Sequence, residues 1–95
     1  MNDNEIRNAI LEFAYNKPKV DGGIEGEEGG RFTTDELSKL ERFEGIEKNI
    51  IDFNIDYLVK EDSLKWPVMG LLVITRKGVN CLRIFNDVVN NNLII

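Results

Sequence analysis

The sequence predicts one mainly helical domain that carries a small β-hairpin. Three observations lead to this expectation. Apolar residues recur at helical spacing in several separate segments, helix-capping residues precede some of these segments, and two short runs typical of strands lie close together in the last third of the chain. A length of 95 residues suits one hydrophobic core, so residues 1–95 are expected to form a single domain.

A first helix is expected over residues 3–16, where Ile6, Ala9, Ile10 and Phe13 would share one face. The pair Lys17-Pro18 ends it. Between positions 21 and 30 follow five glycines and four acidic residues without a cation, which predicts a mobile acidic surface loop over about 20–31. The glycine spacing matches no phosphate-binding loop, and the carboxylates would repel a phosphate. A weak calcium site stays an alternative, although the order of carboxylates matches no EF-hand.

A second helix is expected over residues 34–42. Thr33 and Glu36 have the spacing of a capping box, in which each side chain bonds a free backbone N–H of the first turn. Phe32 and Leu37 have the spacing of the hydrophobic staple that often accompanies such a box. Residues 43–45 then predict a tight turn.

A third helix is expected over residues 46–60. At about 100° per residue, Ile46, Ile50, Phe53 and Tyr57 cluster on one arc, which predicts that this arc is buried. The buried arc would be widened by Ile51, Ile55 and Leu58, and the exposed arc would carry Lys48, Asn49, Asp52 and Asp56.

A hairpin and a fourth helix complete the chain. Asp62 can adopt the left-handed conformation that closes a helix. Residues 63–66 and 71–74 can then pair as strands, with the bend at residues 67–70. Thr75 would cap a helix over about 76–90. Cys81 lies in its apolar part, which predicts a buried and unreactive thiol.

Composition excludes most enzyme classes. The chain has no histidine and one cysteine, so histidine-assisted nucleophiles and a zinc site of ordinary ligands are not expected. We expect no catalytic residue, no metal and no cofactor. No internal disulfide can form, and no stretch has the length and apolarity of a membrane helix or a signal peptide. A cytoplasmic protein without membrane contact is therefore expected.

The order of elements, together with the segment "VITRKGVNCL", resembles the winged helix-turn-helix domains of small bacterial and archaeal regulators. Those domains commonly end the second wing strand with an aliphatic residue, threonine, glycine and leucine at the spacing of Ile74, Thr75, Gly78 and Leu82. The resemblance covers about residues 5–85 and does not indicate a subfamily. Asp62 stands where those domains usually have glycine, and the acidic loop is not a standard part of them.

The resemblance implies a transcriptional regulator that binds double-stranded DNA, with helix 46–60 in the major groove and the wing on the flanking backbone. Cations that could neutralise phosphates are Lys48, Lys60, Lys65, Arg76 and Lys77, and Asn49 could read adenine. Arg76 and Lys77 would lie beside free N–H groups in the first turn of the fourth helix, where an anion can bind.

The charge distribution supports an alternative, namely an acidic winged helix that binds another protein and not DNA. The chain has a net charge of −5. Residues 1–59 hold seven cations and fourteen anions, whereas residues 60–95 hold five cations and three anions, so any attraction to DNA must come mainly from the last third.

A homodimer is also expected, because the fourth helix and the tail carry more apolar residues than one buried face requires. The residues expected at that interface are Cys81, Ile84, Phe85, Val88, Leu93, Ile94 and Ile95.

Overall fold

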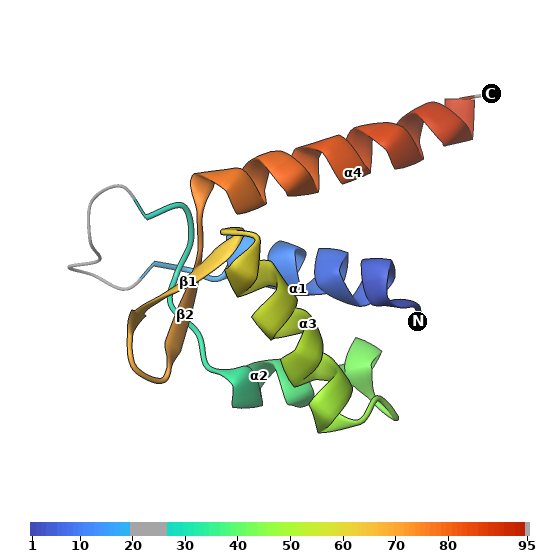
Figure 1. Ribbon diagram of the computed structural model, residues 1–95. Helices are drawn as coiled ribbons and strands as arrows, with labels where there is room; N and C mark the ends of the chain where they lie inside the picture. Colours follow the sequence, from blue (N-terminus) through green and yellow to red (C-terminus); the bar gives the residue numbers. More distant parts are fainter. Residues whose placement is uncertain (20–26, 95) are drawn as a thin grey trace.

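The computed structural model describes residues 1–19 and 27–94, and their side chains as far as residue 88. It is mainly helical with one two-stranded antiparallel sheet, as the sequence predicts (Figure 1). The elements in chain order are α1 (Asp3–Asn16), α2 (Thr34–Ser38), a 3-10 turn (Glu41–Phe43), α3 (Lys48–Lys60), β1 (Leu64–Val68), β2 (Leu71–Ile74) and α4 (Arg76–Ile94).

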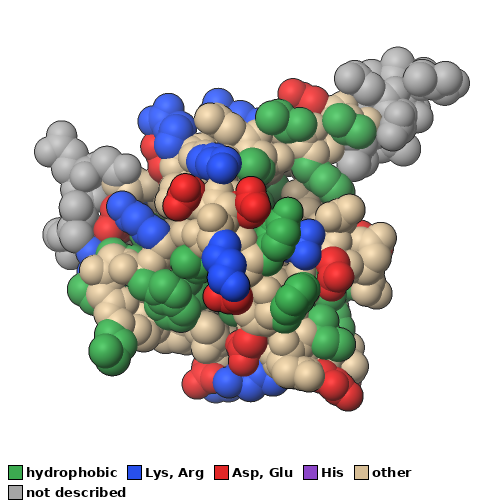
Figure 2. All heavy atoms as spheres, viewed as in Figure 1, with side chains coloured by type: hydrophobic (Ala, Val, Ile, Leu, Met, Phe, Trp, Pro, Cys, Tyr) green, Lys and Arg blue, Asp and Glu red, His purple; other side chains and the backbone are tan. Residues whose placement is uncertain are grey.

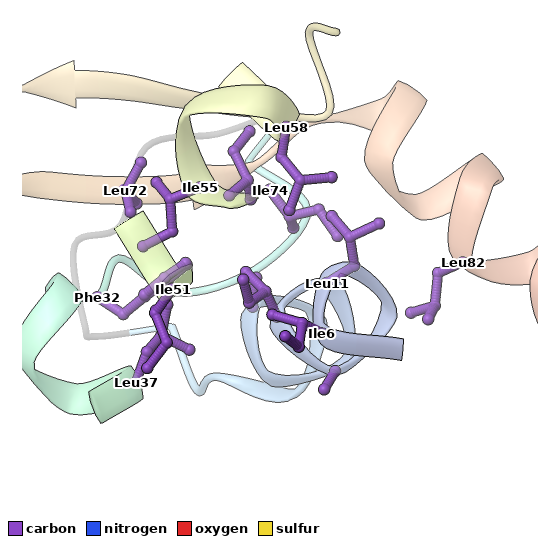
Figure 3. Close-up of a cluster of buried hydrophobic side chains, with 14 of the residues drawn as sticks. Ile6, Leu11, Phe32, Leu37, Ile51, Ile55, Leu58, Leu72, Ile74 and Leu82 are labelled. Atoms are coloured by element: carbon purple, nitrogen blue, oxygen red, sulfur yellow. The ribbon is translucent and has the colours of Figure 1, made fainter. Parts of the chain in front are cut away.

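The hydrophobic core is built around α1, which packs against α3, α4 and β2. Figure 3 shows side chains from these elements pointing into one cluster. A capping box formed by Asn2 and Glu5 starts α1, and its first residue agrees with the expected helix. Ile6, Ala9 and Ile10 are buried, as the sequence predicts. The residue at which α1 begins is therefore determined by the local sequence, whereas the place of α1 in the fold is determined by its contacts with α3, α4 and β2.

The second helix is shorter than expected. The capping box of Thr33 and Glu36 is present, but α2 ends at Ser38 and not at residue 42. Leu40 has an extended backbone (ψ 136°), and the chain continues as the 3-10 turn. This break brings Phe43 into the core. Gly45 has φ +83°, which agrees with the expected tight turn.

The expected buried face of α3 is wrong for Ile50, Phe53 and Tyr57, which are exposed. The helix begins at Lys48, and its buried residues are Ile51, Asn54, Ile55 and Leu58. Asn54 explains why the buried face of α3 is rotated from the expected one. Its buried amide donates to Asp3 Oδ1 (3.2 Å) and to the Ile50 carbonyl (2.9 Å), and its oxygen accepts from Arg7 Nε (2.9 Å). These bonds, two of them to α1, satisfy a polar group inside the interface between the helices.

The hairpin follows a left-handed residue, because Asp62 has φ +62°. β1 begins at Leu64 and includes Pro67, which the sequence had placed at the bend. The register pairs Leu64 with Ile74 and Val68 with Leu71, and an irregularity between Lys65 and Val68 accommodates the proline. The bend is therefore confined to residues 69–70, where Gly70 has φ +87°.

Thr75 joins the hairpin to α4. Its hydroxyl accepts from the Gly78 N–H (3.1 Å) and donates to the Asp62 carbonyl (2.5 Å). Gly78 lies so close to Ser63 that an added β carbon would be 2.3 Å from the Ser63 carbonyl oxygen. Thr75 and Gly78 therefore hold the start of α4 in contact with Asp62 and Ser63, the two residues before β1. The helix continues to Ile94, beyond the expected end at residue 90.

The acidic segment departs from the expected surface loop in its second half. Residues 20–26 lie outside the described residues. Glu27 is buried, and its carboxylate pairs with Arg31 Nη2 at 3.0 Å. Gly30 donates to the Lys17 carbonyl (2.8 Å), and a β carbon on Gly29 would lie 2.3 Å from the Ala14 carbonyl oxygen. The expected surface loop therefore does not describe residues 27–30, which pack closely against the end of α1.

Candidate interaction surface

The exposed side of α3 has an apolar edge, formed by Ile50, Phe53 and Tyr57. Their exposed fractions are 39%, 59% and 40%. The spacing i, i+3, i+7 places them along one line of the helix. Full burial of a phenylalanine side chain is worth about 1.5–3 kcal/mol, so the exposed Phe53 leaves a sizeable part of that energy available to a partner. Figure 2 shows hydrophobic side chains over both α3 and α4 on the same face of the molecule.

The opposite edge of the exposed side, the charged edge, is formed by Lys48, Asp52, Asp56 and Lys60. Lys48 Nζ lies 3.7 Å from Asp52 Oδ2, and Lys60 Nζ lies 2.9 Å from Asp56 Oδ2. Both are exposed pairs at i,i+4 spacing, worth about 0.3–0.5 kcal/mol each. Such weak pairs can open when a partner binds, but each lysine still has an aspartate close to it on the same helix. The charged edge of α3 is therefore neutral in sum.

The other residues expected to contact DNA are spread over α3, β1 and the start of α4. Arg76 Nε donates to Glu28 Oε1 at 2.7 Å, so the acidic segment neutralises this cation. Asn49 is exposed on α3, and Lys65 is exposed on β1. Lys77 is exposed in the first turn of α4 and, among the described residues, forms no ion pair. Figure 2 shows Lys and Arg side chains gathered over the start of α4, with Asp and Glu directly beside them.

The expected contacts are thus only partly brought together. Lys48 and Trp66 line a shallow hollow between α3 and the hairpin, together with Asp52 and Asp56. Lys48 and Lys60 lie at opposite ends of α3, about 18 Å apart at 1.5 Å per residue. Three of the five candidate cations, Lys48, Lys60 and Arg76, are paired with carboxylates of the same chain.

Arg7 stacks on the ring of Tyr57. Its guanidinium carbon lies 3.5 Å from the centre of the Tyr57 ring, and its Nε donates to the buried Asn54. Stacking a cation on an aromatic face is worth about 0.5–1 kcal/mol at an exposed site. The contact therefore favours this orientation of the Tyr57 ring at the end of the apolar edge. The one sequence signal for this arrangement was a carboxamide, Asn54, between apolar residues of the third helix.

A groove between α1, the end of α3 and α4 adjoins the apolar edge. Its cavity has a volume of about 220 Å³ and is lined by apolar groups from all three helices, including Leu11, Tyr57, Leu58 and Phe85. Lys77 and Glu61 supply charges of opposite sign. The Asn8 carboxamide oxygen, also in the lining, is shielded from solvent and has no hydrogen-bond partner among the described residues. The groove connects the exposed apolar residues of α3 with those of α4.

The candidate dimer residues on α4 are exposed as far as the side chains are described. Ile84, Phe85 and Val88 have exposed fractions of 64%, 36% and 54%. Cys81 is exposed, so the expectation of a buried thiol is wrong. It is on the groove side of α4, whereas Val79 and Leu82 provide the buried contacts. The side chains of Leu93, Ile94 and Ile95 lie outside the described part of the chain.

Within residues 1–19 and 27–94, no cluster of three or more acidic, cysteine or histidine side chains could hold a metal ion. In the same residues, none of the helices combines the length and apolarity needed to cross a membrane. Comparison of the chain with family models, with curated proteins and with solved structures finds no match. The interpretation of the surface therefore depends on its own geometry and charge.

Proposed function

We propose that the chain is a winged-helix domain that acts as a protein-interaction module, with the apolar edge of α3 as its docking surface. The observation that carries this proposal is the exposure of Phe53 on α3, between Ile50 and Tyr57. Aromatic side chains such as Phe53 and Tyr57 are typical anchors of protein interfaces. The arrangement of capped α2, turn, α3 and hairpin supports the winged-helix class.

The charge of the chain favours a protein partner over DNA. Nonspecific DNA affinity comes almost entirely from cations that neutralise phosphates. The charged edge of α3 has as many carboxylates as lysines, and the whole chain has a net charge of −5. An apolar line on a chain of net charge −5 suits an amphipathic helix that has cations beside its apolar face. We propose a partner of this chemistry.

A photoreactive amino acid at position 53 tests the proposal in cells that make the full chain. The matched control replaces Met69, which is 99% exposed at the tip of the hairpin. We expect a polypeptide adduct from position 53 and none from position 69. Adducts to nucleic acid from position 53 would contradict a protein-docking role for α3. Purified protein should also show no binding to random duplex DNA at low salt.

DNA binding is the second candidate function, with α3 in the major groove and the hairpin on the backbone. It is favoured by the cations around the start of α4 and by the exposed Lys65 and Asn49. In this case the ion pair of Arg76 with Glu28 would have to open so that Arg76 could bind a phosphate. Binding to random duplex at low salt that depends on Arg76 and Lys77 would support this candidate over the first.

A further inference from the structure

The middle of α4 is more exposed than its beginning. Val79 and Leu82, in the first two turns, are buried, whereas every side chain from Arg83 to Val88 is exposed. Figure 1 shows this part of the helix extending away from the other helices. Helices shorter than about 12–15 residues are marginally stable in water without tertiary contacts. Residues 83–88 therefore depend on the anchored first two turns, and a partner packed against them would stabilise α4 further.

The exposed apolar residues of α4 form a line that suits another helix. Cys81, Ile84, Phe85 and Val88, here called the α4 stripe, have the spacing i, i+3, i+4, i+7. This is the spacing at which two helices pack side by side with interlocking side chains. The stripe is separate from the contacts of Val79 and Leu82 with the core. Because Cys81 and Phe85 also line the groove of their own chain, a second helix on the stripe would pack over the mouth of this groove while α4 stays attached to the domain.

The charge distribution indicates which helix packs against the α4 stripe. Residues 83–94 contain one cation, Arg83, and one anion, Asp87, so this half is neutral in a chain of net charge −5. Charge repulsion between two copies is therefore small here. In addition, α4 has Arg76 and Lys77 in its first turn, where its own dipole disfavours cations by about 0.3–1 kcal/mol each, and it has no cation in its last turn.

An antiparallel second copy of α4 offsets the unfavourable position of Arg76 and Lys77 in the first turn. The first turn of each α4 would then lie beside the last turn of the other, where free carbonyl groups attract cations. Lys77 is suited to this contact because it is exposed and forms no ion pair with any described residue. We propose that two copies of the chain form a twofold dimer through antiparallel α4 stripes, with the axis near Phe85 and each Lys77 beside the partner helix's last turn.

The dimer does not depend on what α3 binds, so it is tested separately, by sedimentation of the full chain at tens of micromolar. We expect a dimer, and Ile84→Asp or Val88→Asp should weaken it at least about tenfold by burying an unpaired charge. Met69→Asp, which adds the same charge at another exposed apolar residue, should leave it unchanged. A monomeric wild-type chain, or equal effects of all three variants, would overturn the proposal.

Lys77→Glu separates the dimer contact from effects within one chain. In a monomer, an acid in the first turn stabilises α4 and should increase its helix content. In the antiparallel dimer it should lose the attraction to the partner helix's last turn and repel it instead, so over two contacts the dissociation constant should rise by at least about three- to thirtyfold. A dissociation constant that stays equal or falls would contradict the antiparallel arrangement, even if the other variants failed to fold.

Cross-linking gives the helix direction independently. In a Cys81→Ser background, antiparallel packing with the axis midway between Ile84 and Val88 places residue 84 of one chain opposite residue 88 of the other. A mixture of the Ile84→Cys and Val88→Cys chains should therefore form a mixed disulfide dimer on oxidation, and neither chain should do so efficiently alone. Efficient self-cross-linking of either single variant would indicate parallel helices and would overturn the proposed arrangement.

Discussion

The carbonyl oxygen of Ser63 lies 2.3 Å from the position that a β carbon on Gly78 would occupy. No real β carbon tolerates such an approach to a backbone atom, so Gly78→Ala must displace α4 from the chain before β1. Alanine gains about 1 kcal/mol of helix propensity over glycine, whereas overpacking costs about 1–3 kcal/mol. We expect a net fall in the free energy of unfolding, measured by urea denaturation.

Asn80→Ala is the matched control for Gly78→Ala, because Asn80 is exposed in the same turn region of α4. This control should be neutral or slightly stabilising. If Gly78→Ala proved as stable as the control, the close contact between α4 and Ser63 would be wrong.

Asn54 should be essential to the contact between α1 and α3. Its side chain is fully buried and bonds Asp3, Arg7 and the Ile50 carbonyl. Asn54→Ala leaves these groups without their partner, which should lower the free energy of unfolding by about 1–3 kcal/mol. Asn49→Ala, an exposed change on the same helix, should stay within about 0.5 kcal/mol. Equal denaturation midpoints for the two variants would show that the network does not contribute to stability.

Phe53 should contribute little to folding. It is exposed, so Phe53→Ser should change the free energy of unfolding by less than about 0.5 kcal/mol. The neighbouring core residue Ile51 gives the contrast, because Ile51→Ala should cost about 2–5 kcal/mol. Thermal denaturation of both variants tests this. A strongly destabilised Phe53→Ser would mean that Phe53 belongs to the core and not to a binding surface.

The ion pair of Lys17 and Glu36 should make the free energy of unfolding depend on pH in the acidic range. The Lys17 ammonium group holds the pKa of the Glu36 carboxyl below its ordinary value of 4.5, although partial burial opposes this. The lowered pKa means that the stabilisation is complete above pH 4.5 and is lost as the pH falls through the folded-state pKa. Glu36→Gln keeps the capping interaction but removes the charge.

The wild-type advantage over Glu36→Gln in the free energy of unfolding should therefore shrink as acid is added. Urea denaturation at several pH values measures it. An advantage that is independent of pH would contradict a contribution from the ionised carboxyl.

Salt dependence tests the second candidate function. If each subunit of a dimer contacts about three phosphates, the logarithm of DNA affinity should fall against the logarithm of salt concentration with a slope of about −5. Replacing both Arg76 and Lys77 by alanine should flatten the slope to about −2. Asn49→Ala should keep the slope and weaken discrimination between sequences. DNA binding that ignored the Arg76 and Lys77 replacements would place the contact surface elsewhere.

Local signals in the sequence predicted the starts of helices well. The capping pairs of Thr33 with Glu36 and of Thr75 with Gly78 need residues only three positions apart, and both are present. The left-handed Asp62 likewise follows from its own conformational range. The end of α2 was missed, because the extended Leu40 brings Phe43 into a core that local sequence does not describe.

The candidate surface was harder to predict, because it depends on contacts between distant segments. Apolar periodicity allowed two overlapping buried arcs for α3, and the choice between them depends on Asn54 bonding to α1. The ion pair between Arg76 and Glu28 joins residues 48 positions apart, so spacing gave no sign of it. By contrast, the pairs on the charged edge of α3 have i,i+4 spacing and were open to prediction from the sequence.

The position of α1 has a consequence for synthesis of the chain. α1 packs against α3, β2 and α4, all of which follow the acidic segment. When α1 leaves the ribosome, the elements that bury Ile6 and Ile10 have not yet been made. Its apolar face therefore stays in water until most of the chain has emerged, so this domain should acquire its core late in translation and not step by step.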